Sequence, residues 1–290
     1  MGSRSADGTG PRAQEGVRPR PAVLRALGAG EPPEVVEIDG VAHQQVRVFK
    51  HDSWAATALY TGPRGLVVCK FHRQQPIAMV PTLWLGRLMA RRERAMLRRL
   101  SDLPHVPALS GEVSIAGKPV PTALAHAFIP GHPLGAQEHV DATFFGQLEA
   151  LLAEIHRRDL AYVDLHKREN VLVGDDGRPY LIDFQIGFAL ADWWLARPLI
   201  GRPLLRMLQR SDLYHLRKHL ARLRPDLLAE ADVHRPWWIW MHRLVAHPFR
   251  VLRRRFLVAI GVRSGSGLVE TEHFAEEGLR RRTLGLRKAG

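Results

Sequence analysis

One stretch of the sequence places three oxygen-bearing side chains at the ends of short apolar runs. Asp164 comes first, Asn170 immediately precedes the apolar residues 171–173, and Asp183 immediately follows residues 180–182. An Asp-Asp-Gly turn signal separates the two apolar runs, so they are predicted to form a β-hairpin. Such a hairpin would bring Asn170 and Asp183 side by side at its open end.

These side chains suit one kind of chemistry. Carboxylate and amide oxygens are the ligands that Mg²⁺ prefers, so Asn170 and Asp183 are predicted to hold Mg²⁺ against the phosphates of a nucleotide. Asp164 is predicted to orient a hydroxyl group and accept its proton. The alternative is a hairpin with polar residues at its ends and no site, and the pattern alone leaves it open.

The stretch from 162 to 173, followed by Asp183-Phe184-Gln185, resembles the catalytic and metal-binding loops of the protein-kinase-like superfamily. It is most similar to the bacterial lipopolysaccharide-kinase and RIO-type branch. Asp164-Leu165-His166 resembles the Asp-Leu-His of small-molecule and lipopolysaccharide kinases more than the Asp-Leu-Lys of eukaryotic protein kinases. The resemblance covers roughly residues 34–225. It implies an α+β fold of two lobes: a small antiparallel β lobe with one helix, and a larger, mostly helical lobe.

The sequence departs from the family pattern in three places. Asn170 lies six residues after Asp164, where the family usually has five. Tyr162-Val163 replaces the usual His-Arg or His-Gly, and Gln185 replaces the usual Gly. All the proposed catalytic oxygens are still present.

The resemblance assigns roles to a lysine and a glutamate upstream. Residues 67–70 (Val-Val-Cys-Lys) resemble the family's V-A-I-K strand, which implies that Lys70 binds the α- and β-phosphates. Glu93 is the only acid in a predicted helix over 82–100, and the resemblance implies that it pairs with Lys70. The alternatives are a solvated strand end for Lys70 and surface pairs with arginines of its own helix for Glu93.

The predicted nucleotide loop, residues 51–57, contains no glycine. Its small residues could still let backbone amides approach phosphates, and the hydroxyls of Ser53 and Thr57 are expected to bind the nucleotide. The competing interpretation is a loop that no longer holds phosphate.

The chain is predicted to have five parts: a disordered basic tail (1–33), an N-terminal nucleotide-binding lobe (34–129), a C-terminal catalytic lobe (130–234), a basic Trp-rich amphipathic segment (235–262) and a mobile basic tail (263–290). Asp141 is expected to cap a helix over about 142–158. Ser211-Asp212 is expected to open another helix.

The net charge of +13 is concentrated near the C-terminus, where residues 235–290 carry twelve Arg or Lys against four Glu, a net +8. Three tryptophans and an arginine cluster in 235–262 make an anionic membrane surface a candidate partner. A helix packed on the large lobe with a solvated basic face is the alternative. Nucleic acid is not expected as a partner, because no zinc-ligand spacing or RNA-binding aromatic motif accompanies the charge.

Several features bear on location. No run of 18 or more apolar residues exists, and no secretory signal is visible, so no bilayer-spanning segment is predicted. The single cysteine, Cys69, excludes an intramolecular disulfide. The expected location is the cytoplasm, with a peripheral position at the inner face of the membrane as an option.

Together these features predict an ATP- and Mg²⁺-dependent kinase that transfers the γ-phosphoryl group to a hydroxyl on a lipopolysaccharide-like saccharide or lipid. A serine/threonine protein kinase and a catalytically inactive pseudokinase or nucleotide-binding scaffold are the alternatives. The predicted catalytic residues are Asp164, Lys70 and Glu93. The predicted nucleotide-binding residues are Lys70, Ser53, Thr57, Asn170 and Asp183, of which Asn170 and Asp183 also bind the metal.

Overall fold

The computed structural model describes residues 21–77, 79–193 and 197–227, with residues 237–238 and the positions 251, 252, 255, 258 and 259. Residues 21–241 form one compact unit, and the strands and helices named below all lie in its described part. Residues 1–20 of the predicted N-terminal tail, most of the segment 235–262 and the tail 263–290 lie outside the described residues. None of the described helices has the length and apolar character needed to cross a bilayer.

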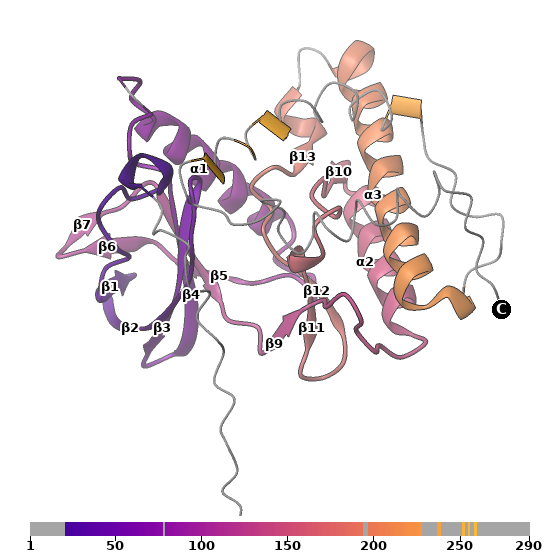
Figure 1. Ribbon diagram of the computed structural model, residues 1–290, viewed down its shortest axis with the longest axis horizontal. Coiled ribbons are helices and arrows are strands. Elements are labelled where there is room, and N and C mark those ends of the chain that lie inside the picture. Colours follow the sequence, from indigo (N-terminus) through magenta and orange to yellow (C-terminus); the bar gives the residue numbers. More distant parts are fainter. Residues whose placement is uncertain are drawn as a thin grey trace, which may run out of the picture. The chain divides into compact units, whose positions relative to one another are not determined.

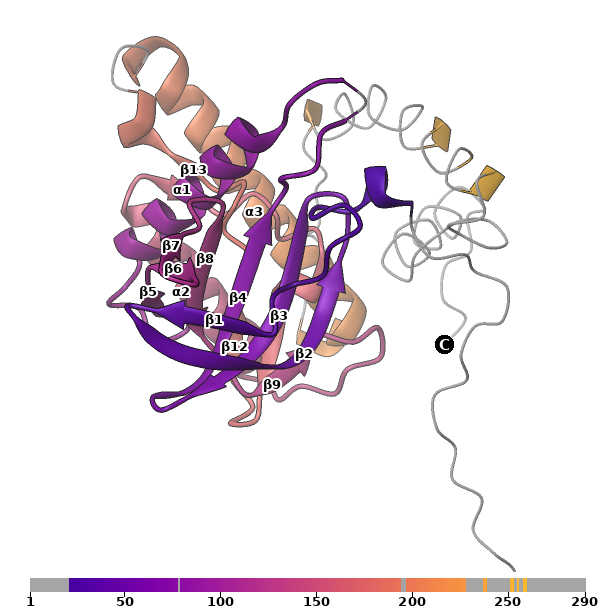
Figure 2. The ribbon, with the colours of Figure 1, turned by 90° about the vertical axis from the view of Figure 1, so that its left-hand side faces the viewer.

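An antiparallel sheet of eight strands forms the small lobe, in the order β5-β8-β4-β3-β2-β1-β6-β7 (Figure 1). The strands are β1 Val35–Ile38, β2 Val41–His51, β3 Ala55–Gly62, β4 Gly65–His72, β5 Leu109–Gly111, β6 Val113–Ile115, β7 Lys118–Pro119 and β8 Ala123–Ala127. The turn between β1 and β2 is tight, because Asp39 and Gly40 both adopt positive φ values of 49° and 79°. Figure 2 shows the sheet curling as it runs from β4 to β1.

The side chains of the central strand β4 alternate across the sheet, and those of residues 67–72 are buried on both faces. The odd-numbered residues from Val67 to Phe71 join the core of the small lobe. Lys70 and His72 lie on the opposite face, which helix α1 (Leu83–Arg99) covers. The helix comes very close, since a Cβ atom at Gly86 would lie 2.1 Å from the carbonyl oxygen of Arg73.

The large lobe contains two long helices, α2 (Phe144–Arg157) and α3 (Arg202–Leu223), and short strands. Strands β11 (Val171–Gly174) and β12 (Pro179–Leu181) form a hairpin that β9 (Gly131–Pro133) extends, and β10 (Leu160–Ala161) pairs with β13 (Phe188–Ala189). The remaining short helices are η1 Ala22–Leu24, η2 Arg168–Asn170, η3 Leu190–Trp193, the π-helix η4 Arg197–Gly201 and η5 Pro225–Leu227. This is the two-lobed α+β arrangement that the family resemblance implied.

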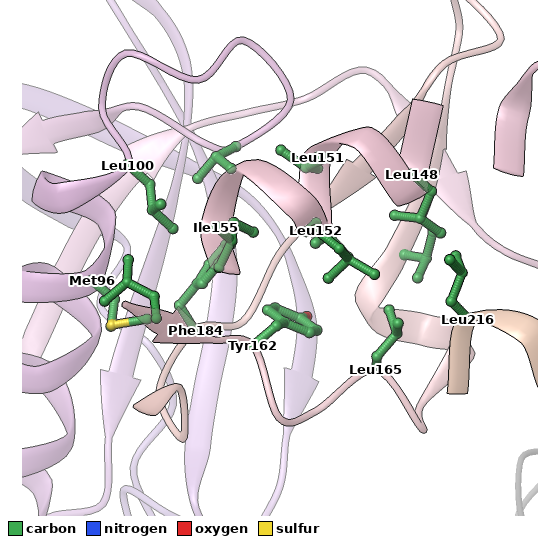
Figure 3. Close-up of a cluster of buried hydrophobic side chains, with 14 of the residues drawn as sticks. Met96, Leu100, Leu148, Leu151, Leu152, Ile155, Tyr162, Leu165, Phe184 and Leu216 are labelled. Carbon is green, nitrogen blue, oxygen red and sulfur yellow. The ribbon is translucent and has the colours of Figure 1, made fainter. Parts of the chain in front are cut away.

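One hydrophobic core joins the two lobes. Met96 on α1 and Leu100 directly after it belong to the same buried cluster as Ile155 on α2 and Phe184 in the loop after β12 (Figure 3). Because the end of α1 is buried in the large lobe, the position of the helix is coupled to the loops that follow β10 and β12.

Two expectations about helix starts had different outcomes. Asp141 does cap its helix, since its Oδ1 accepts hydrogen bonds from the backbone N–H groups of Thr143 and Phe144. The prediction that Ser211-Asp212 opens a helix is wrong: α3 begins at Arg202 and Asp212 lies near its middle. The acidic residue looked like a cap, but its carboxylate serves a tertiary contact instead.

The prediction that the tail extends to residue 33 is also wrong for residues 21–33. Ala26 is fully buried, and its N–H donates to the carbonyl oxygen of Asp52 at 2.7 Å. The buried guanidinium of Arg73 donates to the carbonyl oxygen of Val23 at 2.8 Å. The composition of this segment suggested disorder, but its backbone is held by partners far away in the sequence.

Candidate active site

Lys70 lies at the centre of a buried group of charges. Its Nζ donates to Glu93 Oε1 at 3.1 Å and to Asp183 Oδ1 at 2.7 Å. Burial by itself would lower the pKa of Lys70, but the charges of Glu93 and Asp183 raise it above its usual value. The ammonium group is therefore charged at neutral pH, and it joins β4, α1 and the loop after β12.

The predicted contact between Lys70 and Glu93 is thus present. Glu93 is buried, so the alternative of surface pairs along its own helix does not describe it. A second residue beside Glu93 is His72, whose Nε2 lies 3.3 Å from Glu93 Oε2. Burial raises the pKa of Glu93, but Lys70 and His72 outweigh it and hold the pKa below its usual value.

Asp164 organises the loop between β10 and β11. Its Oδ2 accepts hydrogen bonds from Asn170 Nδ2 at 2.9 Å and from Lys167 Nζ at 2.8 Å. Its Oδ1 accepts no hydrogen bond from the described residues and lies 3.2 Å from His166 Nδ1. Because Oδ2 already accepts two hydrogen bonds, Oδ1 is the oxygen of this buried carboxylate that is left for an acceptor hydroxyl.

The loop accommodates its unusual length through η2. This short helical turn at residues 168–170 carries Asn170 back to Asp164, in spite of the six-residue separation. Burial lowers the pKa of Lys167, but the neighbouring Asp164 charge outweighs it and raises the pKa above its usual value. A charged lysine therefore lies beside the carboxylate.

The predicted hairpin between Asn170 and Asp183 has the expected register. Val171 pairs with Leu181, and the N–H of Ile182 donates to the carbonyl oxygen of Asn170 at 3.0 Å. Asp183 follows directly, with a left-handed φ of 62° that turns the chain as it leaves the strand. The two oxygen-bearing residues therefore lie at the same end of the hairpin, as the sequence predicted.

The donor set fits Mg²⁺. Asn170 uses its amide nitrogen to bond Asp164, which leaves its oxygen as the group that could coordinate a cation. Asp183 adds a carboxylate, and two protein oxygens are typical of Mg²⁺ sites completed by phosphates and water. Within the described part of the chain, no cluster of three or more His, Cys, Asp or Glu side chains could hold a metal.

Asp212 on α3 is a site residue that the sequence did not reveal. Its fully buried carboxylate accepts hydrogen bonds from the backbone N–H groups of Tyr162 and Val163, both at 2.8 Å. Val163 has a φ of 73°, an unfavourable value for a β-branched residue. The two hydrogen bonds therefore hold the chain in a strained turn immediately before Asp164.

The aromatic residues behind the loop explain how the unusual Tyr162 is accommodated. The Tyr162 ring packs edge-on against Phe184, with ring centroids 5.0 Å apart, and its hydroxyl donates to the carbonyl oxygen of Ile182. Burial, with the nearby charges of Asp183 and Asp164, raises the pKa of Tyr162 well above its usual value. The neutral hydroxyl thus ties the loop before Asp164 to the strand before Asp183.

The predicted nucleotide loop is a short turn, residues 52–54, between β2 and β3. Asp52 Oδ1 accepts hydrogen bonds from the N–H groups of Trp54 and Ala55, which fixes the turn without glycine. Ser53 Oγ donates to the carbonyl oxygen of Leu24 at 2.9 Å, so this hydroxyl is engaged with the N-terminal segment. Thr57 pairs directly with Lys70 across β3 and β4, which puts both side chains on one face of the sheet.

His219 on α3 contacts the loop that carries Asp164, and it should make the stability of the fold sensitive to acid. Its Nε2 lies 2.7 Å from the carbonyl oxygen of Leu165, and burial lowers its pKa to about 3 from 6.5. Between these values the unfolded chain binds the proton and the folded chain does not, so stability should fall as the pH drops below about 6.5. At pH 5 the loss should be about 2 kcal/mol.

Urea unfolding at pH 7 and pH 5 checks this. His219→Gln, which can still donate to Leu165, should show a flatter pH dependence than the unmodified chain. His139→Gln, at an exposed position, should leave the dependence unchanged. An equal loss of stability on acidification in all three proteins would contradict the role of His219.

The comparisons with known proteins give little beyond this geometry. No protein-family model and no curated protein matches the chain. One similar solved structure is the ADP/Mg²⁺-phosphoaspartate complex of Rio2 kinase from Chaetomium thermophilum. Its sequence is 17% identical to this chain, and the TM-score is 0.48. The match covers 64% of this chain and 57% of that one. A second structure of that kinase is 14% identical, with 83% and 73% covered and a TM-score of 0.47. The chain spans less than two thirds of the first of these structures, and with TM-scores below 0.5 neither likeness bears on function.

The structure thus brings together five of the seven predicted site residues: Lys70, Glu93, Asp164, Asn170 and Asp183. Thr57 shares a face with Lys70, and the hydroxyl of Ser53 bonds elsewhere. His72 and Lys167 are additional members, which contact Glu93 and Asp164. Asp212 acts one step away, through the backbone of Tyr162 and Val163. Only contacts in the folded chain could identify Asp212 and His72.

Proposed function

We propose that this protein is an ATP- and Mg²⁺-dependent phosphotransferase whose acceptor is a hydroxyl group. The observation that carries the proposal is the contact of Lys70 with both Glu93 and Asp183. Asp183 follows one strand of the β11–β12 hairpin, and Asn170, which bonds Asp164, precedes the other strand. Phosphoryl transfer depends mainly on positioning and charge neutralisation, which such a constellation provides.

Each residue has a defined task in this proposal. Lys70, held by Glu93, contacts the nucleotide phosphates as a fixed positive charge. Asn170 and Asp183 supply the oxygens that hold Mg²⁺, which neutralises the charge on the β- and γ-phosphates when bound. Asp164 orients the acceptor hydroxyl through Oδ1 and takes its proton, while Lys167 keeps Oδ2 in place.

The acceptor is proposed to be a saccharide or lipid at a membrane surface. The strongly basic composition, +13 overall, favours an anionic environment. A protein serine or threonine is the second choice, because no Ala-Pro-Glu follows Asp183, and that motif anchors the segment on which peptides dock in protein kinases.

A nucleotide-binding scaffold without turnover is the competing function. One observation favours it: the turn at residues 52–54 is tied to the N-terminal segment, and the Ser53 hydroxyl bonds Leu24 instead of facing a ligand. Nucleotide binding without transfer would indicate this function, whereas the absence of nucleotide binding would contradict both.

Thermal unfolding with Mg²⁺ and ATP tests the nucleotide site first. Ligand at about 100 times its Kd stabilises a folded protein by about 2.7 kcal/mol, which should raise the Tm by roughly 5–10 °C for a domain of this size. Lys70→Ala and Asp183→Asn should each abolish most of this ligand-induced shift. The shift, not the Tm alone, is the readout, because Lys70→Ala also leaves Glu93 buried with one fewer partner.

Two matched variants control for charge loss alone. Lys118→Ala removes an exposed lysine from the small lobe, and Asp175→Asn removes an exposed carboxylate from the β11–β12 turn. Both should keep the full shift. A shift that survives in Lys70→Ala and Asp183→Asn would place the nucleotide elsewhere.

A further inference from the structure

A short turn between β4 and α1 exposes large apolar side chains. Ile77 and Val80 pair across the turn, and Met79 at its tip is 96% exposed. Val80 is 61% exposed. Figures 1 and 2 show this segment projecting beyond the strands next to α1. Exposing such residues is costly in water, so the turn is suited to an apolar or interfacial environment.

The outer face of α1 continues this surface. Trp84 is 62% exposed, and Leu88, four residues later, is exposed on the same face of the helix. Arg87 and Arg91 alternate with them at helical spacing and are also exposed. Residues Ile77, Met79 and Val80 of the turn, with these four residues of α1, are called here the α1 surface.

The charge on this surface has one sign. Arg87 and Arg91 have no ion-pair partner among the described residues. The only acid in the helix, Glu93, faces inward and is buried against Lys70. Three other arginines of α1 bond elsewhere in the fold, namely Arg92, Arg94 and Arg99.

We infer that the α1 surface docks on an anionic lipid bilayer. Tryptophan favours the headgroup level of a membrane, and arginine can extend its guanidinium to lipid phosphates while its stem stays among apolar groups. Met79 and Val80 would enter the boundary between headgroups and acyl chains. The absence of acid from this face of α1 favours anionic lipid over zwitterionic lipid.

This docking surface is distinct from the basic C-terminal segment and does not depend on phosphoryl transfer. It lies on the face of α1 opposite Glu93, so docking leaves the contact with Lys70 in place. The tight packing of Gly86 on Arg73 keeps the helix seated on β4 while its outer face meets the membrane.

A single labelled cysteine tests the contact at the residue level. Cys69 is fully buried, so a cysteine introduced as Met79→Cys is the thiol that a polarity-sensitive fluorophore should label in the folded protein. Vesicles of phosphatidylcholine with phosphatidylglycerol should shift its emission to shorter wavelength, and vesicles of phosphatidylcholine alone should not. Arg87→Glu with Arg91→Glu should weaken this response at least about tenfold.

The control carries the same label at Leu66→Cys, an exposed apolar position in the β3–β4 hairpin, and should show no shift. Co-sedimentation of the full chain with the vesicles is measured in parallel. Binding without a shift at position 79 would assign membrane contact to another surface and overturn the inference. An equal shift on both kinds of vesicle, or a shift that grows with protein concentration alone, would overturn it as well.

Discussion

Asp164→Asn should lower phosphoryl transfer by about 10²–10⁴-fold, because the amide cannot accept the proton of the acceptor hydroxyl. The substitution preserves the size of the side chain and keeps one oxygen available to Asn170 and Lys167. Binding of Mg²⁺ and ATP should therefore be retained. The measurement is the rate of ADP formation from ATP, with extracted membrane lipids and saccharides offered as acceptors, together with the thermal shift.

The pair of readouts distinguishes the two proposed functions. Loss of turnover with an unchanged ligand-induced shift supports Asp164 as the catalytic base. Asp175→Asn should keep full turnover. Turnover in Asp164→Asn equal to that of the unmodified chain would remove Asp164 from the mechanism. Nucleotide binding with no turnover in any of these proteins would favour the scaffold function.

Asp212→Ala should be among the most destabilising single substitutions in the large lobe. It would leave the N–H groups of Tyr162 and Val163 without an acceptor, and each stranded buried donor costs about 1–3 kcal/mol, so the pair should cost about 2–6 kcal/mol. The strained φ of Val163 would also lose its restraint. Urea unfolding measures the first effect, and turnover should fall because Asp164 follows this turn directly.

A conservative variant at the same position and a variant at an exposed position serve as comparisons for Asp212→Ala. Asp212→Asn keeps one acceptor oxygen and should lie between the alanine variant and the unmodified chain in both stability and turnover. Asp102→Ala removes an exposed carboxylate that bonds Arg158, and it should change stability little, because exposed ion pairs contribute little. If Asp212→Ala is no less stable than Asp102→Ala, the carboxylate does not hold the loop.

The order of the residues fixed the part of the site that depends on local geometry. Asn170 and Asp183 flank two short apolar runs with a turn between them, and a hairpin can only place them at the same end. Asp141 likewise caps its helix through neighbours two and three residues away. Such contacts follow from the sequence because backbone geometry limits what residues this close together can do.

The family resemblance also predicted one contact between segments that are distant in the sequence. Local patterns left Lys70 as a strand end and Glu93 as one acid among arginines. Their pairing was expected only because the strand, the helix and the loop are arranged as the resemblance implied, and the structure has the pairing. The roles of these residues in catalysis remain predictions for the experiments above.

Tertiary structure alone decided the remainder. Asp212 looked like a helix cap, yet its carboxylate bonds backbone groups about fifty residues earlier in the chain. Residues 21–33 looked like a tail, yet the buried Arg73 and the turn at 52–54 hold them in place. A polar side chain or an irregular backbone segment can be satisfied by many partners, and only the packed fold determines which partner is within reach. The sequence by itself therefore determined the hairpin and the oxygen-bearing residues at its open end, whereas the supports that hold the loop around Asp164 and the turn at 52–54 were determined by the tertiary structure.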